Sequence, residues 1–232
     1  MMKPMLIALL SSAVLTASAP PVNAQVGPSK AEQAAYKGLH AAAHSGNVAR
    51  IHKLVSQKHK INARDAHGRT PLMVATFAGK LDAVAALIEA GANTALLEND
   101  KYDALTIAAV DGNTKMVELL IEKGARTDLT TSVYDGTALI AAAHLGHVGV
   151  VTALIAGGAP LDHVNNLKWT ALIESIVLGD GGKNHTEVLG ALVTAGANVN
   201  LADGQGRTPL ALAKARGYAA MIEILTAAGA KD

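Results

Sequence analysis

The apolar positions of the chain recur with one long period. One set of leucines is spaced by 33, 33, 34, 33 and 38 residues, and a second set by 33, 33, 34, 38 and 33 residues. A period of this length predicts a stack of small helical units, each too short to bury its apolar side alone. The first set is Leu39, Leu72, Leu105, Leu139, Leu172 and Leu210; the second is Leu54, Leu87, Leu120, Leu154, Leu192 and Leu225.

Each period predicts two short helices. A Thr or Asp stands before an Ala- and Leu-rich run, where its side chain can cap a helix, and Pro71 and Pro209 suit the first helical position. A glycine such as Gly79 ends this first helix. Residues 81–89 then show helical apolar spacing, and Gly91 predicts a left-handed C-cap. The expected N-caps are Thr70, Asp103, Thr137, Thr170 and Thr208.

The ends of the repeat region differ from its middle. Ser29 and Glu32 have the spacing of a capping box, which predicts a helix before the first repeat. Residues 25–28 are expected to be a loose leader. The fifth period is longer by five residues, which must lie between Gly179 and Leu192, and the fourth has one extra residue before Leu139.

This 33-residue unit resembles the ankyrin repeat. Residues 70–72 and 208–210 match its Thr-Pro-Leu motif, and residues 91–92, 124–125, 158–159, 196–197 and 229–230 match its Gly-Ala. The resemblance covers about residues 36–231. It implies an all-α solenoid of helix-turn-helix pairs with short β-hairpin fingers and atypical terminal caps. After a leader at 25–35, the domain at 36–232 divides roughly into repeats 36–62, 63–95, 96–128, 129–162, 163–200 and 201–232.

The first 24 residues are typical of a secretory signal peptide. Lys3 precedes an apolar run over residues 6–15, and the small-residue sequence Val22-Asn23-Ala24 predicts cleavage after Ala24. A membrane anchor is the disfavoured alternative, because the run is half the roughly 20 residues that a bilayer requires. We expect a periplasmic or secreted protein.

Composition excludes several classes of function. Without residues 1–24, the chain carries 19 basic and 19 acidic side chains and only six aromatic residues. This balance argues against nucleic acid and anionic membranes as partners. With no cysteine, disulfides and thiolate chemistry are excluded. His40 with His44, and His144 with His147, lack a clear third zinc ligand and are expected to be solvated. No cofactor or metal is expected.

The resemblance implies that hairpin tips and first helices form a concave, partner-binding face. We place the residue before each N-cap at a hairpin tip, and the residues before each helix-ending glycine on the concave face. Aromatic residues and Arg are enriched at binding hot spots; the alternative is that each ring packs on its neighbours. We expect a monomer without enzymatic activity that binds a protein through Arg69, Phe77, Tyr102, Asp111, Tyr134, His144, Trp169, Leu178 and Arg207.

The fifth repeat holds a second candidate site. Glu174 stands where an apolar residue is usual, before the glycine-rich loop at 179–188. In the favoured interpretation its carboxylate accepts hydrogen bonds from the loop amides. In the alternative, Glu174, Asp180 and His185 serve a small hydrolase or transferase. A third possibility is a secreted effector that binds a host protein.

Overall fold

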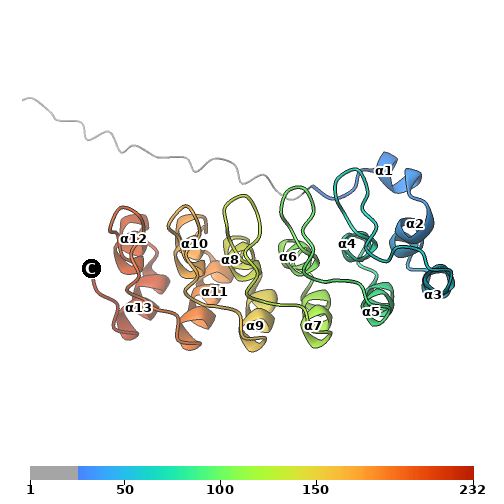
Figure 1. Cartoon of the computed structure of the whole chain (residues 1–232). Coiled ribbons are helices and arrows are strands. Elements are labelled where there is room, and N and C mark those ends of the chain that lie inside the picture. Colours follow the sequence, from blue (N-terminus) through green and yellow to red (C-terminus); the bar gives the residue numbers. More distant parts are fainter. Residues whose placement is uncertain (1–25) are drawn as a thin grey trace, which may run out of the picture.

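The computed structural model describes residues 26–232, which form thirteen helices in a row of pairs (Figure 1). The predicted signal peptide lies outside these residues. Helix α1 (Lys30–Ala35) comes first. The pairs are α2 (Gly38–Ser45) with α3 (Val48–Ser56), α4 (Pro71–Phe77) with α5 (Leu81–Glu89), α6 (Ala104–Val110) with α7 (Thr114–Glu122), α8 (Ala138–His144) with α9 (Val148–Ala156), α10 (Ala171–Val177) with α11 (Lys183–Thr194), and α12 (Pro209–Arg216) with α13 (Ala219–Ala227).

The first helix of each pair begins where the caps predict. In the second to sixth pairs, the side chain of the cap residue accepts a hydrogen bond from the backbone N–H three residues later, as Asp103 does from Thr106 at 2.8 Å. The predicted box at Ser29 and Glu32 is also present. Gly79 follows α4 with φ +64°, and Gly91 follows α5 with φ +92°. Both values lie in the left-handed region, where glycine has no Cβ penalty.

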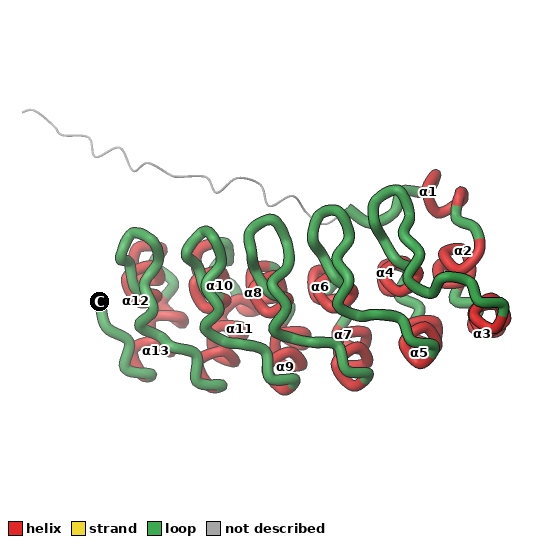
Figure 2. Tube along the Cα trace, viewed as in Figure 1, coloured by secondary structure: helices red, strands yellow, loops and turns green. Residues whose placement is uncertain are grey.

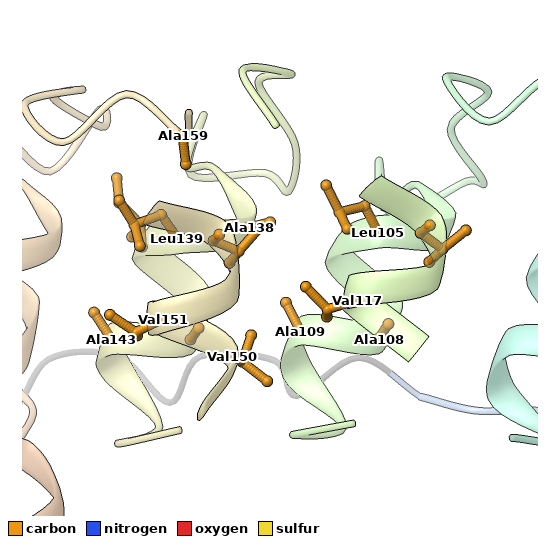
Figure 3. Packing of buried hydrophobic residues seen from close by; sticks show 14 of the residues in the cluster. Leu105, Ala108, Ala109, Val117, Ala138, Leu139, Ala143, Val150, Val151 and Ala159 are labelled. Atoms are coloured by element: carbon orange, nitrogen blue, oxygen red, sulfur yellow. The ribbon is translucent and has the colours of Figure 1, made fainter. Parts of the chain in front are cut away.

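One continuous apolar core runs along the stack. Leu105 and Val117 of one pair and Leu139 and Val151 of the next are buried in it, with alanines between them (Figure 3). The small side chains allow neighbouring helices to approach closely. The principal contacts of α2 to α13 are with helices of their own or the adjacent repeat. Stability is therefore shared between neighbours.

The turns between paired helices also join adjacent repeats. His147 Nε2 lies 3.1 Å from the Val110 carbonyl oxygen, and the Tyr218 hydroxyl donates to the Gly179 carbonyl at 2.9 Å. The His147 ring lies against Gly112, where a Cβ would come within 2.9 Å of it. Glycine is therefore required at this turn for close approach as well as for its φ of +70°.

The connections between repeats form fingers on one side of the first helices (Figures 1 and 2). The five fingers are residues 63–69, 96–102, 130–136, 163–169 and 201–207, named finger 2 to finger 6 after their repeats. The predicted β-hairpins are wrong in detail, because the described residues contain no strand and one isolated bridge, Thr131 to Gly136. Side-chain hydrogen bonds hold the fingers where a β-hairpin would have a ladder of backbone bonds. In finger 2, Asp65 Oδ1 accepts from the N–H groups of His67 and Arg69, both at 2.9 Å.

The insertion in the fifth repeat lengthens its second helix. Helix α11 has 12 residues, against nine in the second helices of the other pairs. Gly181, with φ +69°, takes the left-handed conformation at this turn. Asp180 Oδ1 accepts from the Gly182 N–H at 2.8 Å and closes the loop before α11 begins.

Candidate functional site

The inner face, defined as the fingers together with α4, α6, α8, α10 and α12, carries the predicted binding residues. The residues before the N-caps lie at the base of each finger, so their expected position at the tips is wrong. A backbone bond from Asp65 N–H to the Arg69 carbonyl closes finger 2, and the same bond joins Glu98 to Tyr102. The tips are the intervening residues, such as 66–68.

The N-terminal segment 26–35 covers the inner face at the second repeat. Arg69 is 4% exposed; its Nη1 donates to Glu32 Oε1 at 3.0 Å and its Nη2 to the Val26 carbonyl at 3.3 Å. Gly27 lies so close to Phe77 that a Cβ on it would be 3.3 Å from the ring. The expected loose leader is therefore wrong for residues 26–28, because side chains of the second repeat hold them.

Glu32 is the main electrostatic anchor of this segment. Hydrogen bonds from the Ser29 side chain and backbone, with a contribution from Arg69, lower the pKa of Glu32 to about 2. The same carboxylate lies 2.8 Å from His67 Nε2. The segment is thus held by an ionised carboxylate over the pH range in which proteins normally work.

Tyr102 is buried beneath the inner face. It is 7% exposed and packs with Met73 and Ile107, with Phe77 at the edge of the same cluster. Burial first, and the nearby Glu98 second, raise the pKa of Tyr102. These contacts favour the packing interpretation for Arg69 and Tyr102, and binding by either side chain would require the surface to open.

The fourth and fifth repeats present apolar side chains to solvent. Val133 on finger 4 is 53% exposed, Val164 on finger 5 is 45% exposed, and Leu145 at the end of α8 is 42% exposed. We name these three residues the apolar patch. In the described part of the chain, Val26 is the other large apolar side chain with this exposure. Sequence reasoning missed the patch; the signal was the presence of valines in loops that are otherwise polar.

Fingers 4 and 5 are joined, so the two valines of the patch have a fixed frame. The Asn166 backbone N–H donates to the Tyr134 carbonyl at 2.9 Å, and its side-chain amide donates to the Val133 carbonyl at 3.0 Å. His163 Nε2 lies 2.7 Å from the Asp135 carbonyl oxygen. Of the predicted binding residues, Tyr134, Trp169, His144 and Leu178 are half-buried in these same repeats, whereas Phe77 is partly covered by the leader.

The remaining predicted residues are at the two sides of this region. Asp111 is exposed at the end of α6. Arg207, at the base of finger 6, pairs through Nη2 with Asp203 Oδ2 at 2.6 Å. The repeats thus bring Asp111, Tyr134, His144, Trp169, Leu178 and Arg207 to one face in chain order, although not to a single cluster.

Glu174 has other partners than those predicted. It is 4% exposed, and its Oε1 accepts from the side-chain amide of Asn165 in finger 5 at 2.9 Å. Its Oε2 lies 3.4 Å from His144 Nδ1. The prediction that loop amides bind this carboxylate is therefore wrong, because the loop is closed by Asp180 and finger 5 reaches Glu174 instead.

The three residues of the proposed enzyme do not converge. His185 Nδ1 lies 2.9 Å from Asp180 Oδ1, and its Nε2 lies 2.9 Å from the His144 carbonyl oxygen. Hydrogen bonds from the Gly182 N–H and from His185 lower the pKa of Asp180. Glu174 contacts Asn165 and His144 instead, so the three side chains expected of a hydrolase or transferase do not meet.

Residues 26–232 show neither a metal-binding cluster nor a membrane-spanning helix. No group of three or more potential metal-binding side chains gathers in them, and none of their helices is both long and apolar enough to cross a bilayer. The histidines expected to be solvated are partly engaged: His40 Nε2 lies 3.0 Å from the Arg69 carbonyl, and His147 bonds as described above.

Comparison with known families agrees with this architecture. Residues 39–131 match the family of ankyrin repeats in three copies, and residues 134–166 match one further ankyrin repeat. The ankyrin repeat protein YahD of Escherichia coli K12 is 30% identical over 191 residues, covering 82% of this chain and 94% of YahD. The chain belongs to the ankyrin-repeat family.

Solved structures give the same result. An ankyrin repeat domain from Acinetobacter baumannii AYE is 45% identical, with a TM-score of 0.79, over 83% of this chain and 98% of that domain. A chain from the complex of the predatory endopeptidase Bd0816 with the immunity protein Bd3460, from Bdellovibrio bacteriovorus, is 29% identical with a TM-score of 0.68; 83% of this chain and 98% of that chain are covered. Ankyrin repeats indicate a scaffold for protein–protein interaction.

Proposed function

We propose that this ankyrin-repeat protein is exported to the periplasm, or secreted, and binds a partner protein there without catalysing a reaction. The observation that carries the proposal is the apolar patch: Val133, Leu145 and Val164 are exposed in the fourth and fifth repeats, and half-buried Tyr134 and Trp169 belong to the same two fingers as the valines. Exposed apolar groups beside aromatic side chains are typical of protein-binding surfaces.

Export is proposed from the signal-peptide pattern of residues 1–24. A related chain comes from a complex between a bacterial endopeptidase and an immunity protein, which supports an enzyme as one class of partner. The balanced net charge leaves shape and apolar contact as the main sources of affinity. An enzymatic role has less support, because Glu174 does not meet Asp180 and His185.

The proposal is tested by changing Val133 and Val164 together to Ser. Both side chains are about half exposed, so we expect a melting temperature close to that of the native protein. Crosslinking in intact cells, periplasmic fractionation and affinity capture should identify the partner, and binding by the variant should weaken about tenfold or more, as at a hot spot.

The matched control is Val26→Ser, which replaces an exposed valine on the leader, outside the patch. It should leave binding unchanged. Equal binding by the double variant and the native protein would refute the assignment of the inner face of the fourth and fifth repeats as the partner-binding surface. Recovery of the protein in the cytoplasmic fraction would refute export.

A further inference from the structure

Glu174 is unusual among the buried acidic side chains. Four are less than 9% exposed in the described residues: Glu98, Asp103, Glu174 and Asp203. Glu98 accepts from two backbone N–H groups, Asp103 from one, and Asp203 from two with Arg207 in addition. Glu174 receives neither a backbone N–H nor an Arg, and its Oε2 has no hydrogen-bond donor. A buried carboxyl group in this state is costly to the fold.

The residues around Glu174 differ from those at the equivalent positions of other repeats. At the position of Glu174 the other repeats carry Ala41, Val74, Ile107, Ala141 and Leu212. At the base of fingers 2 and 6, Asp65 and Asp203 pair with Arg69 and Arg207; in finger 5 the same two positions hold Asn165 and Trp169. The Asn165 amide donates to Glu174, where a second carboxylate would have repelled it. Finger 5 therefore accommodates the acid with a neutral donor, and its Lys168 makes no ion pair with Glu174 in the described structure.

The residue nearest to the buried Oε2 that reaches solvent is His144. The His144 side chain is 23% exposed and its Nδ1 lies 3.4 Å from Oε2, longer than a good hydrogen bond. Leu145 of the apolar patch is the next residue, and the loop histidine His185 is engaged by Asp180 and the His144 carbonyl. The His144 imidazole thus covers an acceptor that it does not satisfy.

We infer that the corner between α8, α10 and finger 5 binds a Lys or Arg side chain of the partner protein, with Glu174 Oε2 as acceptor. The incoming cation takes the place of the His144 imidazole. Apolar residues of the partner beside this cation lie on the apolar patch. The inference deepens the proposed function and rests on it. A basic side chain on the partner follows from charge complementarity. A buried carboxylate whose one donor is a neutral amide is stabilised by a cation that donates to its second oxygen.

The test uses random 12-residue peptides displayed on phage and selected on the purified protein. We expect selected sequences to share one Lys or Arg beside Leu, Val or an aromatic residue. A synthetic peptide of this kind, followed by fluorescence anisotropy, should bind at least tenfold more weakly to Glu174→Gln, because the charged acceptor is lost. Glu118→Gln, at an exposed acid of α7 outside the inner face, is the matched control and should stay within twofold.

A second variant separates binding from a purely structural role. His144→Ala uncovers Oε2 and should keep or strengthen binding of the basic peptide, whereas a loss as large as that of Glu174→Gln would overturn the inference. Selected peptides without a basic residue, no selected peptides, or equal binding by Glu174→Gln would also overturn it. If the selected peptides lack a basic residue but do not bind Val133→Ser, the inference about Glu174 fails and the proposed function stands. If neither Val133→Ser nor Val164→Ser changes peptide binding, the proposed function itself is contradicted.

Discussion

At the scale of single residues, the last residue of each finger tip shows how the repeats differ. Gly68 in finger 2 and Gly206 in finger 6 have left-handed φ values of +77° and +76°. Fingers 3, 4 and 5 have the same conformation, with Lys101 at +64°, Asp135 at +53° and Lys168 at +64°. This conformation costs a residue with a Cβ about 1–2 kcal/mol, so three fingers carry strain that fingers 2 and 6 avoid.

Replacing Lys101 by Gly should therefore stabilise the protein. The relief of the left-handed penalty exceeds the extra chain entropy of glycine, and we expect a gain of roughly 0.5–1 kcal/mol in the free energy of unfolding, measured with urea. Gly68→Ala is the opposite control, because its Cβ would lie 2.5 Å from Asn99 Oδ1. A loss of stability in Lys101→Gly would contradict the argument.

At the scale of elements, the leader and α1 form a strap whose position depends on one carboxylate. Glu32 caps α1 through Ser29 and reaches Arg69 across the second repeat. The pKa of Glu32 in the folded state is about 2, against an ordinary value of 4.5. Because the folded value is the lower one, ionised Glu32 stabilises the docked strap above about pH 4.5, and this contribution is lost as the pH falls toward 2.

Acidification from pH 5 to pH 2 should therefore release the strap. NMR amide signals of residues 30–35 should move toward random-coil positions over this range in the native protein. Glu32→Gln cannot ionise, so its strap should already be loosened at pH 7 and show a much smaller pH dependence. Identical titration curves for the two proteins would show that Glu32 does not hold the strap.

At the scale of the whole molecule, the principal contacts among α2 to α13 join helices of the same or adjacent repeats. The principal contacts of α12 and α13 are with each other and with α10 and α11. Removing them uncovers the buried Leu189 and Leu192 but leaves the central repeats in place. Stability of such an array is the sum of repeat and interface contributions.

A chain ending after residue 200 should consequently stay folded with a lower urea midpoint. We expect its m-value to decrease with the reduced surface that unfolding exposes, while circular dichroism shows helix in proportion to the remaining residues. Complete loss of helical signal would mean that the protein behaves as one indivisible core.

The sequence alone determined what depends on near neighbours along the chain. The period, the N-caps, the capping box at Ser29 and the left-handed glycines act within a few residues, so their spacing predicted the helix pairs and the fingers between them. Gly79 and Thr70 needed no knowledge of the adjacent repeats. The left-handed residue of the fifth repeat was harder to predict from the sequence, because the insertion moved this conformation from Gly179 to Gly181.

Tertiary structure decided which side chains are free to bind. Arg69 is buried by a segment that starts 43 residues earlier at Val26, and Glu174 meets His144 from the preceding repeat. Val133 and Val164 are exposed because their fingers project beyond the helices that would otherwise cover them. The exposure of a side chain depends on what the neighbouring repeats place beside it. The same repeat spacing is therefore compatible with a buried or an exposed side chain at a given position.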